Sequence, residues 1–424
     1  MDERIYREYV AILKEELQPA MGCTEPIAVA YCAALARRTL GALPETVEVL
    51  ASANIIKNVK SVIVPNTNGQ RGIAAAAAAG IISDNADAQL QVLASLTPEQ
   101  EDAVGAYLQQ AAFTVRRADK DYVFDIQVRV TAGADSASVE IAGYHTNVIR
   151  IEKNGVVQFH KDYQESGSQH ATDRSLLTVE QIIAFANEVD IADVQETLQR
   201  QIDYNWAIAE EGLRGDYGAN IGRILLQSYG MSIHNRAKAY AAAGSDARMN
   251  GCDLPVVINS GSGNQGLTAS LPVIVYAKEL GVTQQMLYRA LVVSNLVTIH
   301  LKTGIGSLSA YCGATAAGCG AAAGVTYLYG GQYREIAHTI VNAIAIDSGM
   351  ICDGAKASCA AKIASAVEAG LLGMQMQMHE SQFYGGDGIV VKGVENTIRN
   401  IGTLASDGMR ETDRTIIRMM IQEH

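Results

Sequence analysis

The 424-residue sequence predicts an α+β fold, in which a smaller α+β domain is inserted into a mainly α-helical one. Apolar runs rich in alanine and glycine make up most of both ends of the chain, whereas residues 123–160 alternate as strands do. Aromatic residues form only 6% of the chain, which favours closely packed helices of small residues. We expect the helical domain to comprise residues 1–85 and 177–424, and the inserted domain residues 86–176.

The chain opens with an amphipathic helix over residues 1–19, because apolar side chains recur there at helical spacing. Gly22–Pro26 then breaks this helix and starts another, with Thr24 as a suitable N-cap. The apolar run Ile27–Leu40 predicts that the second helix is buried. Cys23 therefore precedes a helix N-terminus, where the partial positive charge should lower the pKa of its thiol. A thiolate there could act as a base, a nucleophile or a ligand.

Two apolar segments, Val47–Ala53 and Val59–Val64, have the composition of strands and lead into a loop of amide and hydroxyl side chains. This loop opens directly onto a helix at Ile73–Ile82. Donors at a helix N-terminus suit an anion such as a carboxylate, although an ordinary turn and cap explains the pattern equally well. The candidate binding residues of this first donor loop are Asn66, Thr67, Asn68 and Gly69.

The inserted domain is expected to begin with a helix at Leu96–Arg116, capped near Thr97. Four strand-like segments follow, and the Asn154-Gly155 pair predicts a hairpin between the last two. His145 falls between two of these strands and could reach a binding site, although a surface or hydrogen-bonded histidine is the simpler interpretation. The expected strands are Val123–Val130, Ser138–Ala142, Asn147–Lys153 and Val156–His160.

A second donor loop, Asn259–Gly266, again precedes a helix, at Leu267–Leu280. It lacks the Gly-Lys-Ser/Thr ending of a phosphate-binding P-loop and the spacing of a dinucleotide fingerprint, so an amino-acid carboxylate suits it better than a nucleotide. Its candidate binding residues are Ser260, Ser262 and Asn264. The other helices expected after residue 173 are Thr178–Val189, Val194–Gly212, Ala219–Ala243, Met286–Leu301, Tyr333–Gly349 and Ala360–Met378.

Cys352 and Cys359 are the two ends of a segment that contains an Asp-Gly turn. We expect Cys352 in a loop and Cys359 at the start of a helix, a geometry that suits an iron–sulfur cluster. Two buried cysteines acting as small apolar residues are the alternative. Cys312 and Cys319 both lie in the glycine-rich run Gly304–Gly324, and spacing alone does not choose between them as a third ligand.

Composition excludes several classes of protein. The net charge of −12 and the absence of a Lys/Arg block argue against a nucleic-acid binder. No apolar stretch reaches about 18 residues, so no membrane span is expected. The N-terminus lacks the apolar core of an export signal, and the seven cysteines then indicate thiols or ligands in a reducing compartment. We expect a cytoplasmic enzyme or binding protein.

Six motifs together resemble the L-cysteine desulfidase family, which is related to the oxygen-sensitive iron–sulfur L-serine dehydratases. The resemblance runs nearly end to end. It implies a [4Fe–4S] cluster held by Cys312, Cys352 and Cys359, with Cys23 as the candidate base. The motifs are Gly22–Pro26, Pro65–Gly69, Ser260–Gly266, Cys312-Gly313, Cys352–Lys356 and Phe383–Gly388.

The resemblance implies β-elimination of L-cysteine to hydrogen sulfide, pyruvate and ammonia, with L-serine as the alternative substrate. The polar residues of the two donor loops and His145 would bind this small amino acid, and we expect a homo-oligomer, in the simplest case a dimer. A pyridoxal-phosphate lyase would instead need a Schiff-base lysine, for which Lys302 and Lys356 are the candidates. A non-enzymatic iron–sulfur protein would not need the donor loops. A structural zinc site is disfavoured, because the thiols are scattered.

Overall fold

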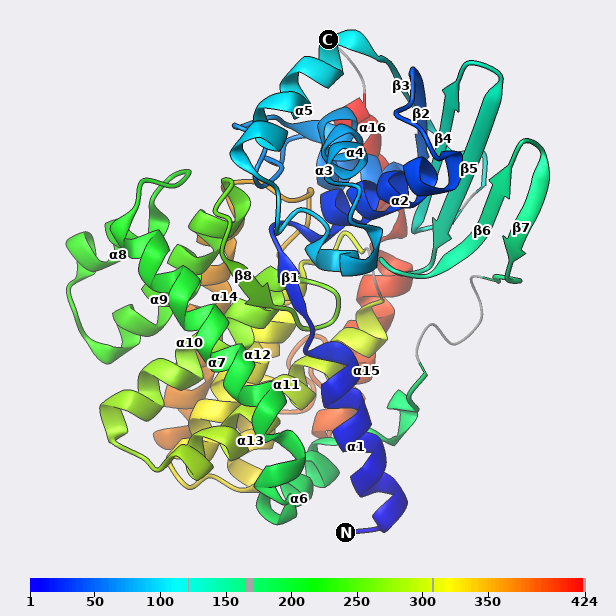
Figure 1. Ribbon diagram of the computed structural model, residues 1–424. Coiled ribbons are helices and arrows are strands. Elements are labelled where there is room, and N and C mark those ends of the chain that lie inside the picture. The colour runs from blue at the N-terminus through cyan, green and yellow to red at the C-terminus, as the bar shows by residue number, and fades with distance from the viewer. Residues whose placement is uncertain (121, 165–170, 307–308, 422–424) are drawn as a thin grey trace.

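A six-stranded mixed sheet stands beside a body of packed α-helices in the computed structural model of the chain (Figure 1), which describes residues 1–120, 122–164, 171–306 and 309–421. The α+β fold class and the dominance of helix are confirmed. The sheet and its helices occupy the upper part of the view in Figure 1, and the helical body the lower part.

The sheet has the strand order β3-β2-β4-β5-β6-β7, in which β2 and β3 are parallel and all other neighbours are antiparallel. Asn154 and Gly155 both adopt positive φ between the last two strands, as the predicted hairpin requires. The strands are β2 (Thr46–Ala51), β3 (Ala112–Arg117), β4 (Asp125–Ala132), β5 (Asp135–Ala142), β6 (Val148–Lys153) and β7 (Val156–His160).

Helices from the first hundred residues share an apolar core with this sheet. Val49, Ile126 and Val139 of the sheet join Ile27 and Ala76 in one buried cluster. The domain boundary that the sequence predicts at residue 85 falls within this core, and the boundaries themselves stay a prediction. The elements beside the sheet are α2 (Thr24–Leu40), α3 (Ala53–Val59), α4 (Gly72–Ser83), the 3₁₀ turn η1 (Ala86–Gln91) and α5 (Pro98–Gln110).

The helical body forms a second, larger apolar core around α12, whose residues from Ala314 to Leu328 are all buried. A two-stranded antiparallel ribbon of β1 (Pro19–Met21) and β8 (Pro255–Val257) lies between the two cores. The body comprises α1 (Glu3–Glu16), η2 (Arg174–Leu176), α6 (Val179–Glu188), α7 (Ile191–Arg214), α8 (Ile221–Tyr229), α9 (Ile233–Met249), α10 (Gly263–Leu280), α11 (Gln284–Ile305), α12 (Gly313–Leu328), α13 (Tyr333–Ile346), α14 (Cys359–Met378), α15 (Val394–Thr403) and η3 (Leu404–Gly408). The last helix, α16 (Arg410–Ile421), leaves the body and packs against α3.

Glycines let the neighbours of α12 approach it closely, as the small-residue composition predicts. A Cβ added at Gly318 would lie 2.3 Å from the carbonyl oxygen of Ala366 in α14. One added at Gly320 would lie 2.1 Å from Thr298 Oγ1 of α11. Such contacts are possible only without a side chain, so these glycines fix how closely the helices pack.

Three predicted elements differ from the structure. The strand expected at Val59–Val64 is not formed, since α3 runs to Val59 and only Ile63 makes an isolated bridge. The helix expected at Leu96–Arg116 ends at Gln110 and is followed by the edge strand β3. The helix expected at Ala219–Ala243 is divided into α8 and α9 by a turn at Gly230, whose φ is 81°. Among the described residues, no helix combines the length and apolar character needed to cross a membrane.

The buried Asp246 of α9 should make the stability of this body depend on pH. Its Oδ2 accepts a hydrogen bond of 3.0 Å from the N–H of Gly222 in α8, but burial raises its pKa from 3.8 to about 6. A raised carboxyl pKa stabilises the fold fully below the unfolded value, and this contribution is lost as pH rises through about 6. Asp246→Asn should therefore remove about 3 kcal/mol of pH dependence between pH 4 and 7. Urea unfolding of wild type and variant across that range gives the free energy of unfolding at each pH. The same change of this free energy with pH in both proteins would contradict the prediction.

Candidate active site

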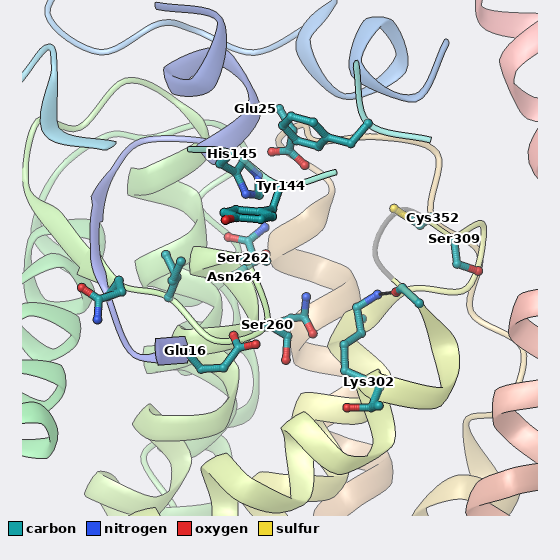
Figure 2. A pocket seen from close by; sticks show the side chains of 18 of the residues that line it. Glu16, Glu25, Tyr144, His145, Ser260, Ser262, Asn264, Lys302, Ser309 and Cys352 are labelled. Atoms are coloured by element: carbon teal, nitrogen blue, oxygen red, sulfur yellow. Dashed lines mark hydrogen bonds between the residues drawn. The ribbon is translucent and has the colours of Figure 1, made fainter. Parts of the chain in front are cut away.

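A cavity of about 1090 Å³ lies between the sheet side and the helical body. Glu25, Asn58 and His145 line it from the first core, and Ser260 and Lys302 line it from the second. In Figure 2, Glu25 lies at the top of the cavity with His145 below it, Cys352 lies to the right, and Lys302 lies at the lower right. The site is therefore built by both halves of the fold.

All three predicted ligand cysteines, Cys312, Cys352 and Cys359, line this cavity. Cys312 is the N-cap of α12, Cys352 lies in a loop, and Cys359 is the first residue of α14, as the turn at Gly354 predicts. Backbone bonds from Cys312 N to Met350 O (3.0 Å) and from Cys352 N to Ala310 O (2.6 Å) hold the first two segments together. A hydrogen bond between these thiols raises the pKa of Cys312 and lowers that of Cys352.

Cys319 is separated from this group. It lies inside α12, is 2% exposed, and does not belong to the cavity wall. Burial raises the pKa of its thiol, as expected of a cysteine in an apolar core. The geometry thus distinguishes the two cysteines of the glycine-rich run, which their spacing in the sequence does not.

Three helices direct their N-termini toward the thiols. The residue pairs in close contact, Gly318 with Ala366 and Ala322 with Gly370, show that α12 and α14 run parallel. The contacts of Gly313 with Gln265 and of Gly324 with Val273 show the same for α10 and α12. The positive ends of these helices therefore meet at one place, where they favour thiolates and other anions.

The second donor loop also lies on the cavity wall, with Ser260, Ser262 and Asn264 all among the lining residues. It is held from behind by the buried Asn259, whose Nδ2 donates to Asn295 Oδ1 at 2.9 Å. Arg248 supports the other end through a bond of 3.0 Å from its guanidinium to Asn264 Oδ1. The loop is thus placed as a binding loop would be, and the roles of its side chains stay predictions.

The first donor loop is placed differently, because its polar side chains bond within the chain. Asn66 Nδ2 donates to Leu93 O at 3.0 Å, Thr67 Oγ1 to Val64 O at 2.7 Å, and Asn68 Nδ2 to Asp102 Oδ1 at 2.8 Å. None of Asn66, Thr67, Asn68 and Gly69 is among the described residues that line the cavity. The internal hydrogen bonds of this loop match an ordinary turn and helix cap more closely than a binding site for an anion. Substrate binding by these residues stays a prediction.

Cys23 lies at the start of α2, as the sequence predicts, but it is itself the N-cap and Thr24 is the first helical residue, so the predicted Thr24 cap is wrong. The expected lowering of the Cys23 pKa is also wrong. Burial and the carboxylate of Glu25 raise the pKa of the thiol well above its usual value, and outweigh the helix start. Cys23 is 2% exposed and packs against Met249 and Cys359 behind the cavity wall. Its Sγ donates to Glu25 Oε2 at 3.2 Å, so Glu25, rather than Cys23, faces the cavity.

His145 reaches the cavity, as was expected for a histidine between two strands. Its ring lies edge-on to Phe124 with 5.0 Å between the ring centroids, and burial lowers its pKa. Its Nε2 is buried and has no hydrogen-bond partner among the described residues. That nitrogen is therefore available to a ligand.

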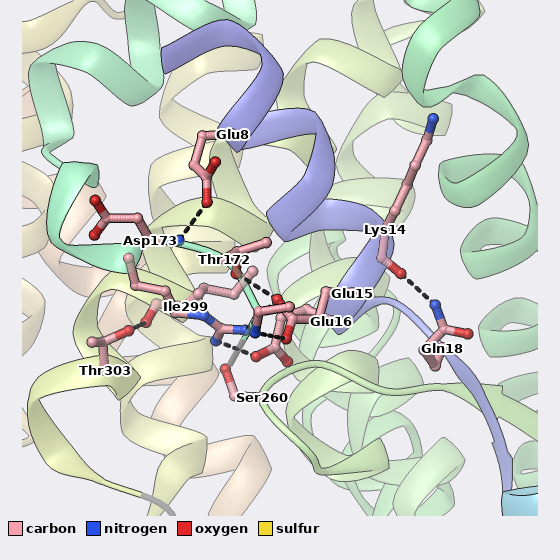
Figure 3. Close-up of polar contacts among 12 residues, drawn as sticks. Glu8, Lys14, Glu15, Glu16, Gln18, Thr172, Asp173, Ser260, Ile299 and Thr303 are labelled. Carbon is pink, nitrogen blue, oxygen red and sulfur yellow. Dashed lines mark hydrogen bonds and ion pairs between the residues drawn. The ribbon is translucent and has the colours of Figure 1, made fainter. Parts of the chain in front are cut away.

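A buried ion pair closes one side of the cavity. Arg174, 9% exposed, hydrogen-bonds to Glu16 at the end of α1, which is 5% exposed, and its second guanidinium nitrogen lies 3.5 Å from Glu15. Figure 3 shows Glu15 and Glu16 opposite Thr172 and Asp173, with Ser260 of the second donor loop below them. The pair ties the start of η2 to the helix that begins the chain.

Several polar lining residues were not assigned to a site by the sequence, among them Glu25, Lys57 and Asn58, and Lys302 was named only as a possible Schiff-base lysine. Lys302 is 7% exposed, donates to Gly306 O, and has a pKa lowered to about 8 by burial. Lys57 forms an ion pair of 2.6 Å with Asp413 of α16. The sequence does carry a signal for such positions, namely a charged or amide residue inside an otherwise apolar segment. Such residues are rarely buried without a partner.

Residues 87–418 match the family model of the serine dehydratase alpha chain. UPF0597 proteins align with nearly the whole chain. That of Desulfitobacterium hafniense is 57% identical, covering 99% of this chain and 98% of its own length. Those of Lachnoclostridium phytofermentans and Treponema denticola are 49% and 44% identical, covering 98% and 100% of this chain and 100% of their own lengths. The chain belongs to the UPF0597 family and carries a serine dehydratase alpha chain domain.

The Arg174–Glu16 pair should be important for stability. Arg174→Ala leaves a buried carboxylate without its cation and should lower the free energy of unfolding by about 3–5 kcal/mol. Replacing both residues by Met should cost much less, because neither charge is then left unpaired. Urea unfolding of the three proteins measures this. A double variant as unstable as Arg174→Ala would contradict it.

Proposed function

We propose that the chain is an iron–sulfur-dependent L-cysteine desulfidase, which eliminates hydrogen sulfide from L-cysteine and yields pyruvate and ammonia. The family model makes amino-acid β-elimination the class of chemistry. The observation that carries the finer proposal is the meeting of Cys312, Cys352 and Cys359 with a donor loop on one cavity wall.

The residues present suit a [4Fe–4S] cluster. Within the described residues, no three His, Cys, Asp or Glu side chains converge closely enough for a single metal ion. A cluster makes a different demand, because each thiolate binds its own iron and the thiols stand further apart. Of the three thiols, Cys352 has a pKa lowered to about 6, first by its hydrogen bond with Cys312 and further by the charges of Lys57 and Lys362, whereas the pKa values of Cys312 and Cys359 are raised. Iron would therefore bind a thiolate at Cys352 and displace the protons of the other two.

The proposed chemistry divides between the cluster and the chain. A bound cluster with one iron free of protein ligands supplies a Lewis acid for the leaving group. Ser260, Ser262 and Asn264 position the substrate, and His145 Nε2 offers it a further hydrogen bond. Cys23 stays the proposed base for the Cα proton; its thiol donates to Glu25 in the structure, so it must first lose that proton and reach the cavity before it can act. Elimination gives aminoacrylate, which becomes pyruvate and ammonia in water.

L-Serine is the second candidate substrate, because the description of the matching family names serine dehydratase. Both amino acids fit the same elimination and differ only in the leaving group. A pyridoxal-phosphate lyase would use Lys302, since Lys302 lines the cavity. The expected homo-oligomer belongs to this proposal as well.

The cofactor and the ligand set can be tested together. Anaerobically purified protein should be brown, contain about four irons per chain, and lose pyruvate production in air. Cys312→Ser, Cys352→Ser and Cys359→Ser should each lose iron and visible absorbance, whereas Cys319→Ser should keep both. Pyruvate release is assayed with L-cysteine and with L-serine, and sulfide release is measured alongside it with L-cysteine. The amino acid that is turned over faster is the preferred substrate. A protein that stays iron-free after anaerobic reconstitution would refute the proposal, and a yellow, air-stable chromophore would favour pyridoxal phosphate.

The role of Cys23 has a separate test. Cys23→Ala should reduce kcat by about 10²–10⁴-fold while iron content and the cluster absorption are unchanged, because a general base contributes about that much. Cys32→Ala is the matched control, since Cys32 is also buried in α2 but packs against the sheet. Undiminished activity in Cys23→Ala would remove it from the role of base.

A further inference from the structure

Glu25 is a buried carboxylate with no direct ion-pair partner among the described residues, and the charges of His145 and Arg248 act on it only from further away. Both of its oxygens take part in hydrogen bonds: Oε1 accepts from Asn58 Nδ2 at 2.9 Å, and Oε2 accepts from Cys23 Sγ at 3.2 Å. Thr24 Oγ1 lies 3.0 Å from Oε2. Every one of these partners is neutral, and no ion pair among the described residues includes Glu25. A carboxylate in a protein interior is normally paired with a cation, because its desolvation is otherwise uncompensated.

The next acceptor on the same wall is also without a partner. Asn58 is 7% exposed, and its amide is turned so that Nδ2 donates to Glu25 while Oδ1, also buried, has no hydrogen-bond partner among the described residues. Glu25 and Asn58 both line the cavity. This wall therefore offers a negative charge and an adjacent carbonyl oxygen, and an alkylammonium group is the ligand that supplies a charge and several N–H donors together.

The position of the pair relative to the thiols fits a small amino acid. α3, which carries Asn58, contacts the cysteine loop directly, since a Cβ added at Gly354 would lie 2.5 Å from the carbonyl oxygen of Lys57. Cys23, two residues before Glu25, belongs to a small buried cluster against which Cys359 packs. An ammonium bound at Glu25 is thus close to the thiol end of the cavity.

We propose that Glu25 and Asn58 form the site that binds the α-ammonium group of the amino-acid substrate. This inference rests on the proposed function for the identity of the substrate, but the ammonium site itself requires only the geometry. It assigns the ammonium to the sheet side of the cavity and leaves the second donor loop to the carboxylate. Glu25 and Asn58 are positioning residues that decide whether a ligand with an amino group is preferred.

The competing role for Glu25 is that of the base. Burial acts to raise its pKa, but His145, the Cys23 thiol and a backbone N–H lower it more, so the net shift is downward. A carboxylate that holds its proton this weakly accepts the Cα proton poorly, whereas a permanent negative charge is what an ammonium group requires. The two roles also predict different kinetics, which separates them.

The test compares L-alanine with propionate on the anaerobic holoenzyme, because the two ligands share a carboxylate and carbon chain and differ in the α-ammonium. Binding is measured by calorimetry and by the rise in Tm, and inhibition constants are measured alongside. Wild type should prefer L-alanine by about 10- to 100-fold, the usual effect of a hydrogen bond to a charged group. Glu25→Gln should bring the two close to parity and raise the KM of the amino-acid substrate by a similar factor, with a smaller loss of kcat.

Three variants accompany this comparison. Glu25→Asp retains the charge and should recover part of the preference. Asn58→Leu keeps Glu25 but removes the adjacent oxygen, and should reduce the preference for L-alanine by about 3- to 10-fold. This variant keeps the proposal testable if Glu25→Gln does not fold. Glu15→Gln removes a carboxylate from the same cavity while Arg174 keeps its buried partner Glu16, and should leave the preference unchanged.

The outcomes separate this inference from the proposed function. An unchanged preference for L-alanine in Glu25→Gln, with KM unaltered and kcat reduced, would overturn the ammonium site while the desulfidase stands. If wild type eliminates from neither L-cysteine nor L-serine, yet binds L-alanine over propionate only when Glu25 is present, then the ammonium site stands and the proposed function fails.

Discussion

The parallel packing of α10, α12 and α14 is the constraint on which the site depends. Glycines at positions 318, 320, 324 and 370 remove the side chains that would otherwise separate these helices from their neighbours. Because the three helices run in the same direction, their N-termini share one end of the body. Those three N-termini carry the second donor loop, Cys312 and Cys359. The close packing of the helices, although it lies far from the cavity, therefore determines which residues meet in the cavity.

This arrangement gives the cavity two ends of opposite character. The helix N-termini and the lysines beside the thiols make the helical end positive, which suits thiolates and a carboxylate. The sheet end carries Glu25, whose net charge is maintained by hydrogen bonds from neutral groups. A zwitterionic amino acid has the matching distribution of charge. Both cores contribute to this distribution of charge, since Glu25 and Lys57 come from the sheet side and Lys302 and Lys362 from the helical body.

Local sequence patterns predicted the elements well where one physical rule dominates. Alternation located the strands β4 to β7 within about two residues, and the Asp353-Gly354 turn placed Cys352 and Cys359 correctly. The prediction failed at α3, because Asn54, Lys57 and Asn58 are buried there to serve the cavity and an ion pair, and this obscures the helical period of the apolar residues. The two donor loops look alike in sequence, yet only the second lies on the cavity wall. Tertiary placement decides that, and a single sequence does not encode it locally.

The same tertiary placement changes the interpretation of Cys23. A helix N-terminus lowers a thiol pKa only while its dipole is the largest influence, and here burial and the charge of Glu25 are larger. The thiol is therefore protonated at rest and directs its proton at the carboxylate that we assign to the substrate's ammonium group. Arrival of that ammonium group would offset the negative charge that keeps the thiol protonated.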